Sequence, residues 1–162
     1  MADVIDIQKA IVAEMKLIDD PASLTGGKLK SGIDLDECGF TASDLPFMWV
    51  QRGALQGTPT DLGSGLVAAV RNYPLWLYVV ETIGDSGSLD SAASYDTASN
   101  WLTPILTYWW DRQFLTTSDG TAFRVVGFAD NGDVGMFGRD NSRRFAGVIF
   151  NLQIETIEQQ RG

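Results

Sequence analysis

Acidic side chains occur in two places where their spacing could hold a cation. Three acids lie within residues 34–37, and Asp130 and Asp133 flank Asn131-Gly132. Carboxylate oxygens are ligands that Ca²⁺ prefers, but neither group has the spacing of an EF-hand loop. Asn, Asp and Gly are also the ordinary residues of tight turns. Turn and loop chemistry explains both groups, so we expect no metal site.

Two short patterns resemble parts of nucleophile and phosphate sites. Gly84-Asp85-Ser86-Gly87 looks like the nucleophile segment of trypsin-like proteases, but the chain has no histidine to act as the base. Gly26-Gly27-Lys28 lacks the preceding glycine and the following hydroxyl of a phosphate-binding loop. A pair of carboxylates could still serve a glycosidase. The acids lie mainly in turns and loops, however, so we expect no enzyme, no catalytic residue and no cofactor.

One basic cluster and one tryptophan stand apart from the expected core. Arg139, Arg143 and Arg144 surround a turn signal in an acidic chain. They could be a solvated turn, but charge complementarity with an acidic neighbour favours an intersubunit contact. Trp110 lies off the apolar stripe of its expected helix, and tryptophan is common at protein contacts. We therefore predict Arg139, Arg143, Arg144 and Trp110 as interface residues.

The composition is that of one globular domain with an acidic surface. Of the 162 residues, 44% are hydrophobic and 20% are charged, which is enough for one sizeable core. The net charge of −9 argues against general binding to nucleic acid or to an anionic membrane. The single cysteine, Cys38, cannot form a disulfide within the chain. We find no signal-peptide pattern and no apolar run of roughly 20 residues, so we expect an intracellular protein with no membrane partner.

Apolar residues recur at helical spacing in two stretches. Asp3–Ile18 places five apolar side chains at intervals of three and four residues, which predicts an amphipathic helix. Asn100–Leu115 places Trp101, Ile105 and Trp109 on one stripe, which predicts a second helix lying across a sheet.

The C-terminal third carries the strongest strand signals. Asn131-Gly132 between two apolar runs predicts a β-hairpin, because a type I′ turn needs positive φ at both central residues. After Arg144, the even-numbered residues from Ala146 to Ile154 are all apolar, which predicts one buried face. The odd face turns polar after Ile149, so the strand should become half solvated. We expect the even face to pack on the tryptophan-rich helix.

The remaining elements complete the expected architecture. Strands are expected at Phe47–Arg52 and Leu75–Thr82, and long loops at 21–45, 53–66 and 84–93. We expect one domain spanning 1–162 with an α+β fold. Its mostly antiparallel sheet would have about four to five strands, with two main helices packed against it and a C-terminal β-hairpin.

The order of these features resembles the tail terminator (tail completion) proteins of long-tailed phages. The features that carry the resemblance are the first helix (Asp3–Ile18), a strand after proline (Pro46–Val50), an aromatic strand (Leu75–Glu81), a W-L-x-P-I-L helix (Trp101–Leu106) and a last strand with an aromatic-x-Gly-x-Ile pattern (Phe145, Gly147, Ile149). The two long loops and the short strand before Gln51 depart from the family. A neighbouring neck component, such as a head–tail stopper or joining protein, therefore remains an alternative.

The resemblance implies a structural virion protein of the tail and neck, made in the host cytoplasm. It would form a hexameric ring that caps the tail tube, ends tube polymerisation and joins the tail to the head connector. Its partners would be its own copies, the tail tube protein and the connector or stopper protein. DNA would pass through the lumen without sequence-specific binding, which an acidic wall would favour; the acidic charge also serves solubility alone.

A different class of function is a small-ligand or carbohydrate-binding module. Aromatic rings stack on sugars and amphipathic ligands, and Trp49, Trp76 or Trp110 could provide such a surface. This alternative requires an open aromatic cleft in a monomer.

Overall fold

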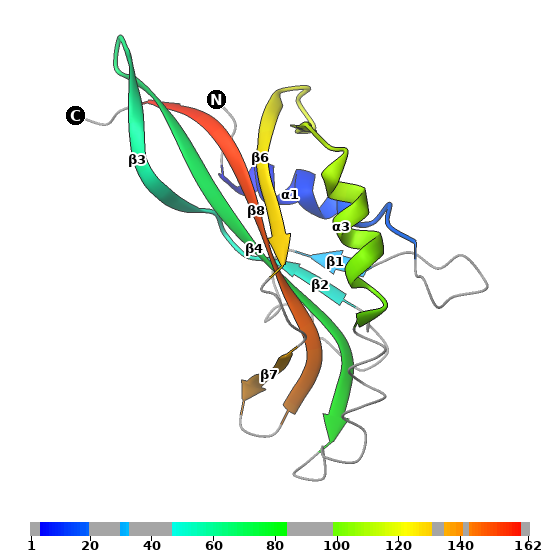
Figure 1. The fold of residues 1–162 in the computed structure, drawn as a ribbon. Helices are drawn as coiled ribbons and strands as arrows, with labels where there is room; N and C mark the ends of the chain where they lie inside the picture. Colours follow the sequence, from blue (N-terminus) through cyan, green and yellow to red (C-terminus); the bar gives the residue numbers. More distant parts are fainter. Residues whose placement is uncertain are drawn as a thin grey trace.

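Two long antiparallel strands, β4 and β8, form the middle of the fold in this computed structural model, which describes residues 4–19, 30–32, 47–83, 99–130, 135–140 and 143–159 (Figure 1). The described elements are α1 (Val4–Met15), β1 (Lys30–Gly32), β2 (Phe47–Val50), β3 (Ala54–Gly63), β4 (Leu66–Ile83), α3 (Leu102–Trp110), β5 (Phe114–Thr116), β6 (Ala122–Asp130), β7 (Gly135–Asp140) and β8 (Arg143–Gln159).

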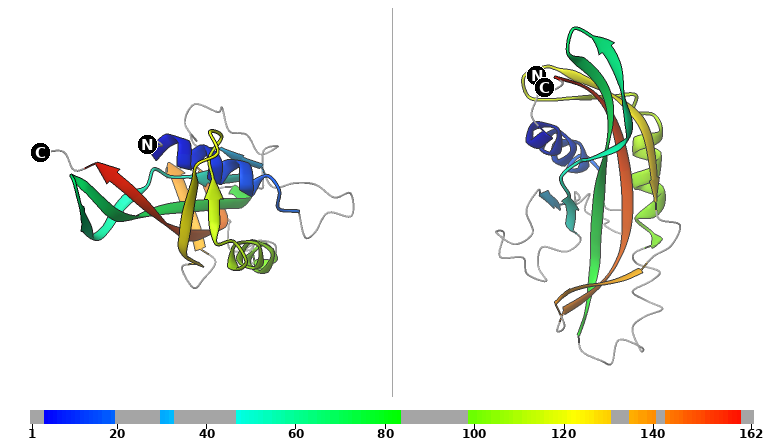
Figure 2. Two further views of the ribbon diagram at one scale, coloured as in Figure 1. Left: turned by 90° about the horizontal axis from the view of Figure 1, so that it is seen from above. Right: turned by 90° about the vertical axis from the view of Figure 1, so that its left-hand side faces the viewer.

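The strands form one curled sheet in the order β1-β2-β4-β8-β6-β5 (Figure 2). Strand β3 continues the edge of β2 along β4, and β7 continues the edge of β6 along β8. Every pairing is antiparallel except that of β1 with β2. A mostly antiparallel sheet with two helices was predicted, but its eight described strands exceed the expected four to five.

Helix α1 lies between the two ends of the curled sheet. It contacts β1, β2 and β5, which stand at or near opposite ends of the strand order. The Gln8 side chain donates a hydrogen bond to the Val50 carbonyl at 3.2 Å, and the Ser31 hydroxyl donates to the Val12 carbonyl at 3.0 Å. The predicted apolar stripe of this helix is confirmed as buried at Ile7, Ile11, Met15 and Ile18.

Helix α3 is shorter than predicted. It ends at Trp110, and Phe114 and Leu115 belong to strand β5 instead. The helix starts at Leu102, so Pro104 lies in its first turn, where a missing N–H costs no internal hydrogen bond. The predicted stripe of Trp101, Ile105 and Trp109 is buried.

One apolar cluster joins both helices to one face of the sheet, which we call the inner face. As predicted, the even-numbered residues of β8 supply one side of this cluster. Its fully buried sheet residues include Met48 and Val50 on β2, Tyr73, Leu75 and Leu77 on β4, and Val148, Phe150, Leu152 and Ile154 on β8. Because side chains alternate along a strand, the odd-numbered residues of β8 lie on the opposite, outer face.

A polar contact joins the two helices. The Tyr108 hydroxyl donates a hydrogen bond to the Glu14 carboxylate, and the Arg112 guanidinium lies 3.4 Å from the same carboxylate. Arg112 also donates to the Tyr108 hydroxyl at 2.6 Å and lies over the Tyr108 ring. Burial and the hydrogen bond to Glu14 raise the pKa of Tyr108.

The prediction of a loop at 53–66 is wrong. Ala54–Gly63 forms strand β3, and a tight turn connects it to β4. Between Gln56 and Thr60 the strand has two residues more than its partner, and this bulge holds Gly57, with φ of 70°, and Pro59. Bulges accept Gly and Pro, which explains how a loop-like composition forms an edge strand.

The prediction of a β-hairpin with its turn at Asn131-Gly132 is also wrong. Strands β6 and β7 do not pair with each other; both pair with β8, one after the other. Four residues lie between Asp130 and Gly135, whereas two lie between their partners Phe150 and Gly147 on β8. The C-terminal hairpin joins β7 to β8 across residues 141–142.

Several sequence predictions fall outside the described residues. These are the Gly84-Asp85-Ser86-Gly87 and Gly26-Gly27-Lys28 patterns, the acids at 34–37, the loop at 84–93, and the loop at 21–45 apart from β1.

Candidate interaction surface

The outer face of the sheet carries a straight row of paired residues across five strands. The row consists of Phe114 on β5, Arg124 on β6, Glu155 on β8, Val70 on β4 and Gln56 on β3. Directly paired residues in antiparallel strands hold their side chains on the same face, close enough to contact. In a neighbouring row, Ile157 pairs with Ala68.

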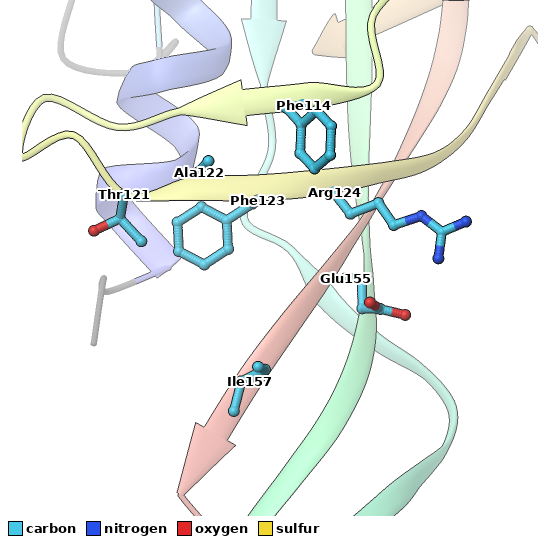
Figure 3. Close-up of a pocket in the computed structure, with 7 residues that line it drawn as sticks. All are labelled: Phe114, Thr121, Ala122, Phe123, Arg124, Glu155 and Ile157. Carbon is cyan, nitrogen blue, oxygen red and sulfur yellow. The ribbon is translucent and has the colours of Figure 1, made fainter.

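A groove of about 420 Å³ lies at the β5–β6 end of this row (Figure 3). Its lining residues are Phe114, Thr121, Ala122, Phe123, Arg124, Glu155 and Ile157. Phe114 and Ile157 stand on the two strands that flank β6, and they are 59% and 55% exposed. The groove therefore offers two exposed apolar side chains to solvent, with Phe123 and the small Ala122 also in its lining.

Two opposite charges occupy one end of the groove (Figure 3). Arg124 and Glu155 are cross-strand partners, and neither makes a hydrogen bond or an ion pair with the side chains that the structure describes. Arg124 is exposed, whereas Glu155 is half-buried. The guanidinium is thus available to a carboxylate from outside the chain.

On the inner face, by contrast, the charged residues Arg71 and Glu158 form an ion pair with each other. Arg71 donates to the Glu158 carboxylate through Nε at 2.5 Å and through Nη2 at 3.1 Å. This hydrogen bonding lowers the pKa of Glu158 and raises that of Arg71. Arg71 also reaches the Gly53 carbonyl at 3.4 Å, so the pair joins β4 and β8 to the start of β3. We assign it a structural role.

The turn between β5 and β6 fixes one border of the groove. The Asp119 carboxylate accepts hydrogen bonds from the Thr117 hydroxyl at 2.5 Å and from the Thr121 backbone N–H at 3.0 Å. These bonds lower the pKa of Asp119 to about 2. Gly120 completes the turn with φ of 86°, a conformation that glycine adopts without strain.

The β3–β4 arm, Ala54–Asn72, extends the sheet beyond both helices (Figure 1). Leu55, Leu62 and Leu66 are 48%, 52% and 39% exposed along it. The tip turns through Gly63, Ser64 and Gly65, all with positive φ. The Asp61 carboxylate accepts a hydrogen bond from the Gly63 N–H at 2.8 Å and so fixes the tip.

The free edge of the arm, strand β3, has features that oppose the addition of another strand. A bulge and a proline interrupt β3, and both features are ways in which edge strands avoid pairing with another chain. Contact through the arm is therefore expected from its apolar side chains.

The structure separates the predicted interface residues into two regions. Trp110 is 69% exposed and is the last residue of α3, which ends near the β5–β6 side of the molecule (Figure 1). Arg139 lies in β7, and Arg143 and Arg144 begin β8, at the other end of the sheet; their side chains lie outside the described part. The arginines therefore do not form one surface with Trp110.

Sequence reasoning missed the groove. Phe114 was assigned to a helix, and Arg124 had no signal that distinguished it from other surface arginines. Ile157 had one: it returns an apolar residue to the odd face of β8 after polar Asn151, Gln153 and Glu155.

Within the described residues, no group of three or more His, Cys, Asp and Glu side chains could hold a metal ion. None of the helices described is both long and apolar enough to cross a bilayer. No protein-family model matches the chain, and no curated protein matches it.

Proposed function

We propose that this chain is a structural subunit of a phage tail or neck, which assembles with its own copies into a ring that caps the tail tube. The observation that carries the proposal is the distribution of exposed apolar side chains. Five of the nine large ones in the described part belong to the arm and the groove: Leu55, Leu62, Leu66, Phe114 and Ile157. Apolar groups gathered on projecting surfaces are typical of protein contacts.

The two surfaces differ in shape, which suits a ring. An arm that docks in the groove of the next copy, whose own arm docks in a third copy, makes a heterologous contact, and repeated heterologous contacts close into rings when the rotation permits. The ring would end tube polymerisation and present a surface to the head connector. The hexameric state and these partners come from the family resemblance, as does the placement in the virion.

The net charge of −9 supports the same proposal. A lumen lined by acidic subunits repels phosphate and lets DNA pass without binding. The same acidic charge would serve a head–tail stopper or joining protein equally well, so that alternative stays open.

The carbohydrate-binding alternative has less support. Trp49 and Trp76 are half-buried on the outer face with ring centroids 6.4 Å apart, and the Trp76 indole donates to the Gln51 side chain at 3.0 Å. Stacking on a sugar needs an open aromatic face. Of the three tryptophans considered for this role, Trp110 alone is exposed.

Electron microscopy of phage particles assembled without this protein tests the proposal. We expect tails of irregular, extended length that lack heads, because tube growth would have no stop and no joining surface. Normal tails attached to heads in its absence would exclude the terminator function. Tails of normal length without heads would favour the joining protein.

A further inference from the structure

The groove and the arm tip have complementary chemistry. We propose, resting on the self-assembly in the proposed function, that the arm tip of one copy (Asp61–Leu66) docks in the groove of a second copy. Leu62 lies between Phe114 and Ile157, and the Asp61 carboxylate pairs with the Arg124 guanidinium.

The apolar part of this contact follows from exposure. Leu62 is 52% exposed at the tip, and Phe114 and Ile157 are 59% and 55% exposed in the groove. Each would remove apolar surface from water on docking, which is the main driving force of association. A leucine side chain also suits a groove whose lining combines Phe114, Phe123 and Ile157 with the small side chain of Ala122.

The polar part follows from charge. Arg124 has no ion-pair partner among the described residues, although the chain carries 21 acids against 12 bases. Asp61 uses one carboxylate oxygen to accept from the Gly63 N–H, which fixes its orientation and leaves further acceptor positions. An arginine and a carboxylate at an interface give specificity and register.

The tip cannot reach the groove of its own chain. Leu66 pairs with Gln159, and Ala68 pairs with Ile157, so the base of the arm is part of the same ladder that forms the groove wall. In the strand order β8 lies between the arm and β6, and the pairing of β4 with β8 holds the arm on that side. A second copy is therefore the occupant that offers this tip.

A charge exchange tests the docking. The probe is the purified full chain, and sedimentation velocity measures its mass over a range of concentrations. Arg124→Glu and Asp61→Arg should each weaken association by about tenfold or more, because each places like charges together. The double variant Arg124→Glu with Asp61→Arg should restore it. Lys16→Glu makes the same charge change at an exposed position outside the groove lining and the arm, and should leave association unchanged.

Each outcome either supports the docking or overturns it. Circular dichroism confirms that the variants are folded. Wild-type-like association of both single variants would overturn the docking, as would a double variant that stays dissociated, or a wild-type chain that never associates. The proposed function can fail separately: normal tails without the protein would exclude it even if the charge exchange works. If neither Arg124→Glu nor Asp61→Arg changes the association, the docking is excluded while the ring proposal remains.

Discussion

The indole ring of Trp109 on α3 stacks on the phenyl ring of Phe128 on β6, with ring centroids 5.6 Å apart and planes at 24°. Phe128 in turn stacks on Phe150 of β8, with centroids 5.4 Å apart and planes at 12°. Three aromatic rings from three elements therefore form one column. The column fixes α3 on the inner face, opposite the face that carries the exposed side chains of Phe114 and Ile157.

Removing the middle ring should loosen the column. Phe128→Ala should lower the free energy of unfolding by about 3 kcal/mol, since it removes a large ring between two buried ones. Phe114→Ala is the matched control, because it deletes the same group from an exposed position and should cost about 0.5 kcal/mol or less. Urea unfolding followed by tryptophan fluorescence measures both. Equal costs would show that the column contributes no more than a surface ring.

A methyl group at Gly53 should be poorly tolerated. A Cβ there would lie 2.4–2.8 Å from three ring atoms of the fully buried Tyr73. Gly53→Ala should therefore destabilise the chain by about 1–3 kcal/mol. At Gly127 a Cβ would meet only the end of the flexible Gln153 side chain, at 2.8 Å, so Gly127→Ala should change stability by about 0.5 kcal/mol at most. Thermal unfolding of the two variants compares them directly, and an equal loss would contradict the close approach to Tyr73.

Stability should depend on pH through Glu158. Arg71 lowers the pKa of this carboxyl in the folded chain, so its contribution is present above the ordinary value of 4.5 and is lost as pH falls through the folded pKa. Glu158→Gln should cost about 0.5–1 kcal/mol at neutral pH, and the cost should fade as the pH falls from 4.5 through the folded pKa. Glu155→Gln, which removes no ion pair within the described residues, is the control. Urea titrations at several pH values measure the difference; a cost that does not vary with pH would exclude the pair as its cause.

The exposed leucine at the arm tip should matter for assembly and not for folding. Leu62→Ser should weaken self-association by about tenfold, the effect of losing one buried apolar side chain. Leu17→Ser removes the same group from a position of similar exposure, 56% against 52%, next to α1. Light scattering should find association changed only by Leu62→Ser. If both variants associate like the wild type, the arm makes no apolar contact.

The interface role of Arg143 and Arg144 stays a prediction, because the structure does not describe their side chains. Arg143 and Arg144 begin β8, where their backbone pairs with β7 on one side and β4 on the other. Arg143→Glu combined with Arg144→Glu should leave the chain folded and weaken assembly by about tenfold. Circular dichroism and electron microscopy measure the two effects. Intact rings of the double variant would identify the cluster as solvated surface.

The sequence predicts those parts of the fold that repeat a simple period. The even face of β8 and the stripes of α1 and α3 are long enough for the alternation or helical spacing to be unambiguous. The same patterns predict that the tryptophan helix packs on the even face of β8. Both belong to one buried cluster, but Trp109 stacks on Phe128 of β6, and Phe128 in turn stacks on Phe150 of β8.

The sequence fails where pairing between distant segments decides the local structure. Strand β3 has a loop-like composition, yet β4 provides its hydrogen-bond partners. Pro74 lies inside β4 and has no backbone N–H to donate. Its carbonyl faces the junction between β2 and β3, where it accepts a hydrogen bond from the Gln51 backbone N–H at 2.9 Å. The missing N–H is tolerated because that side of β4 faces a junction between two strands. Asn131-Gly132 lies outside the described residues, but the strands on either side of it both pair with the longer β8 and not with each other.

The groove could not be predicted for the same reason. Phe114 and Arg124 become neighbours only through the register of the β5–β6 hairpin, and Glu155 joins them from β8, which is distant along the chain. None of the three belongs to a local motif, so a single sequence holds no signal that joins them.

The mass of the purified chain in solution tests the central claim of self-assembly most directly. Sedimentation velocity over a range of concentrations should show a closed species of six times the 17.7 kDa chain mass, formed at the expense of the single chain. Electron micrographs of that species should show rings. A single-chain mass of 17.7 kDa at every concentration would contradict the claim.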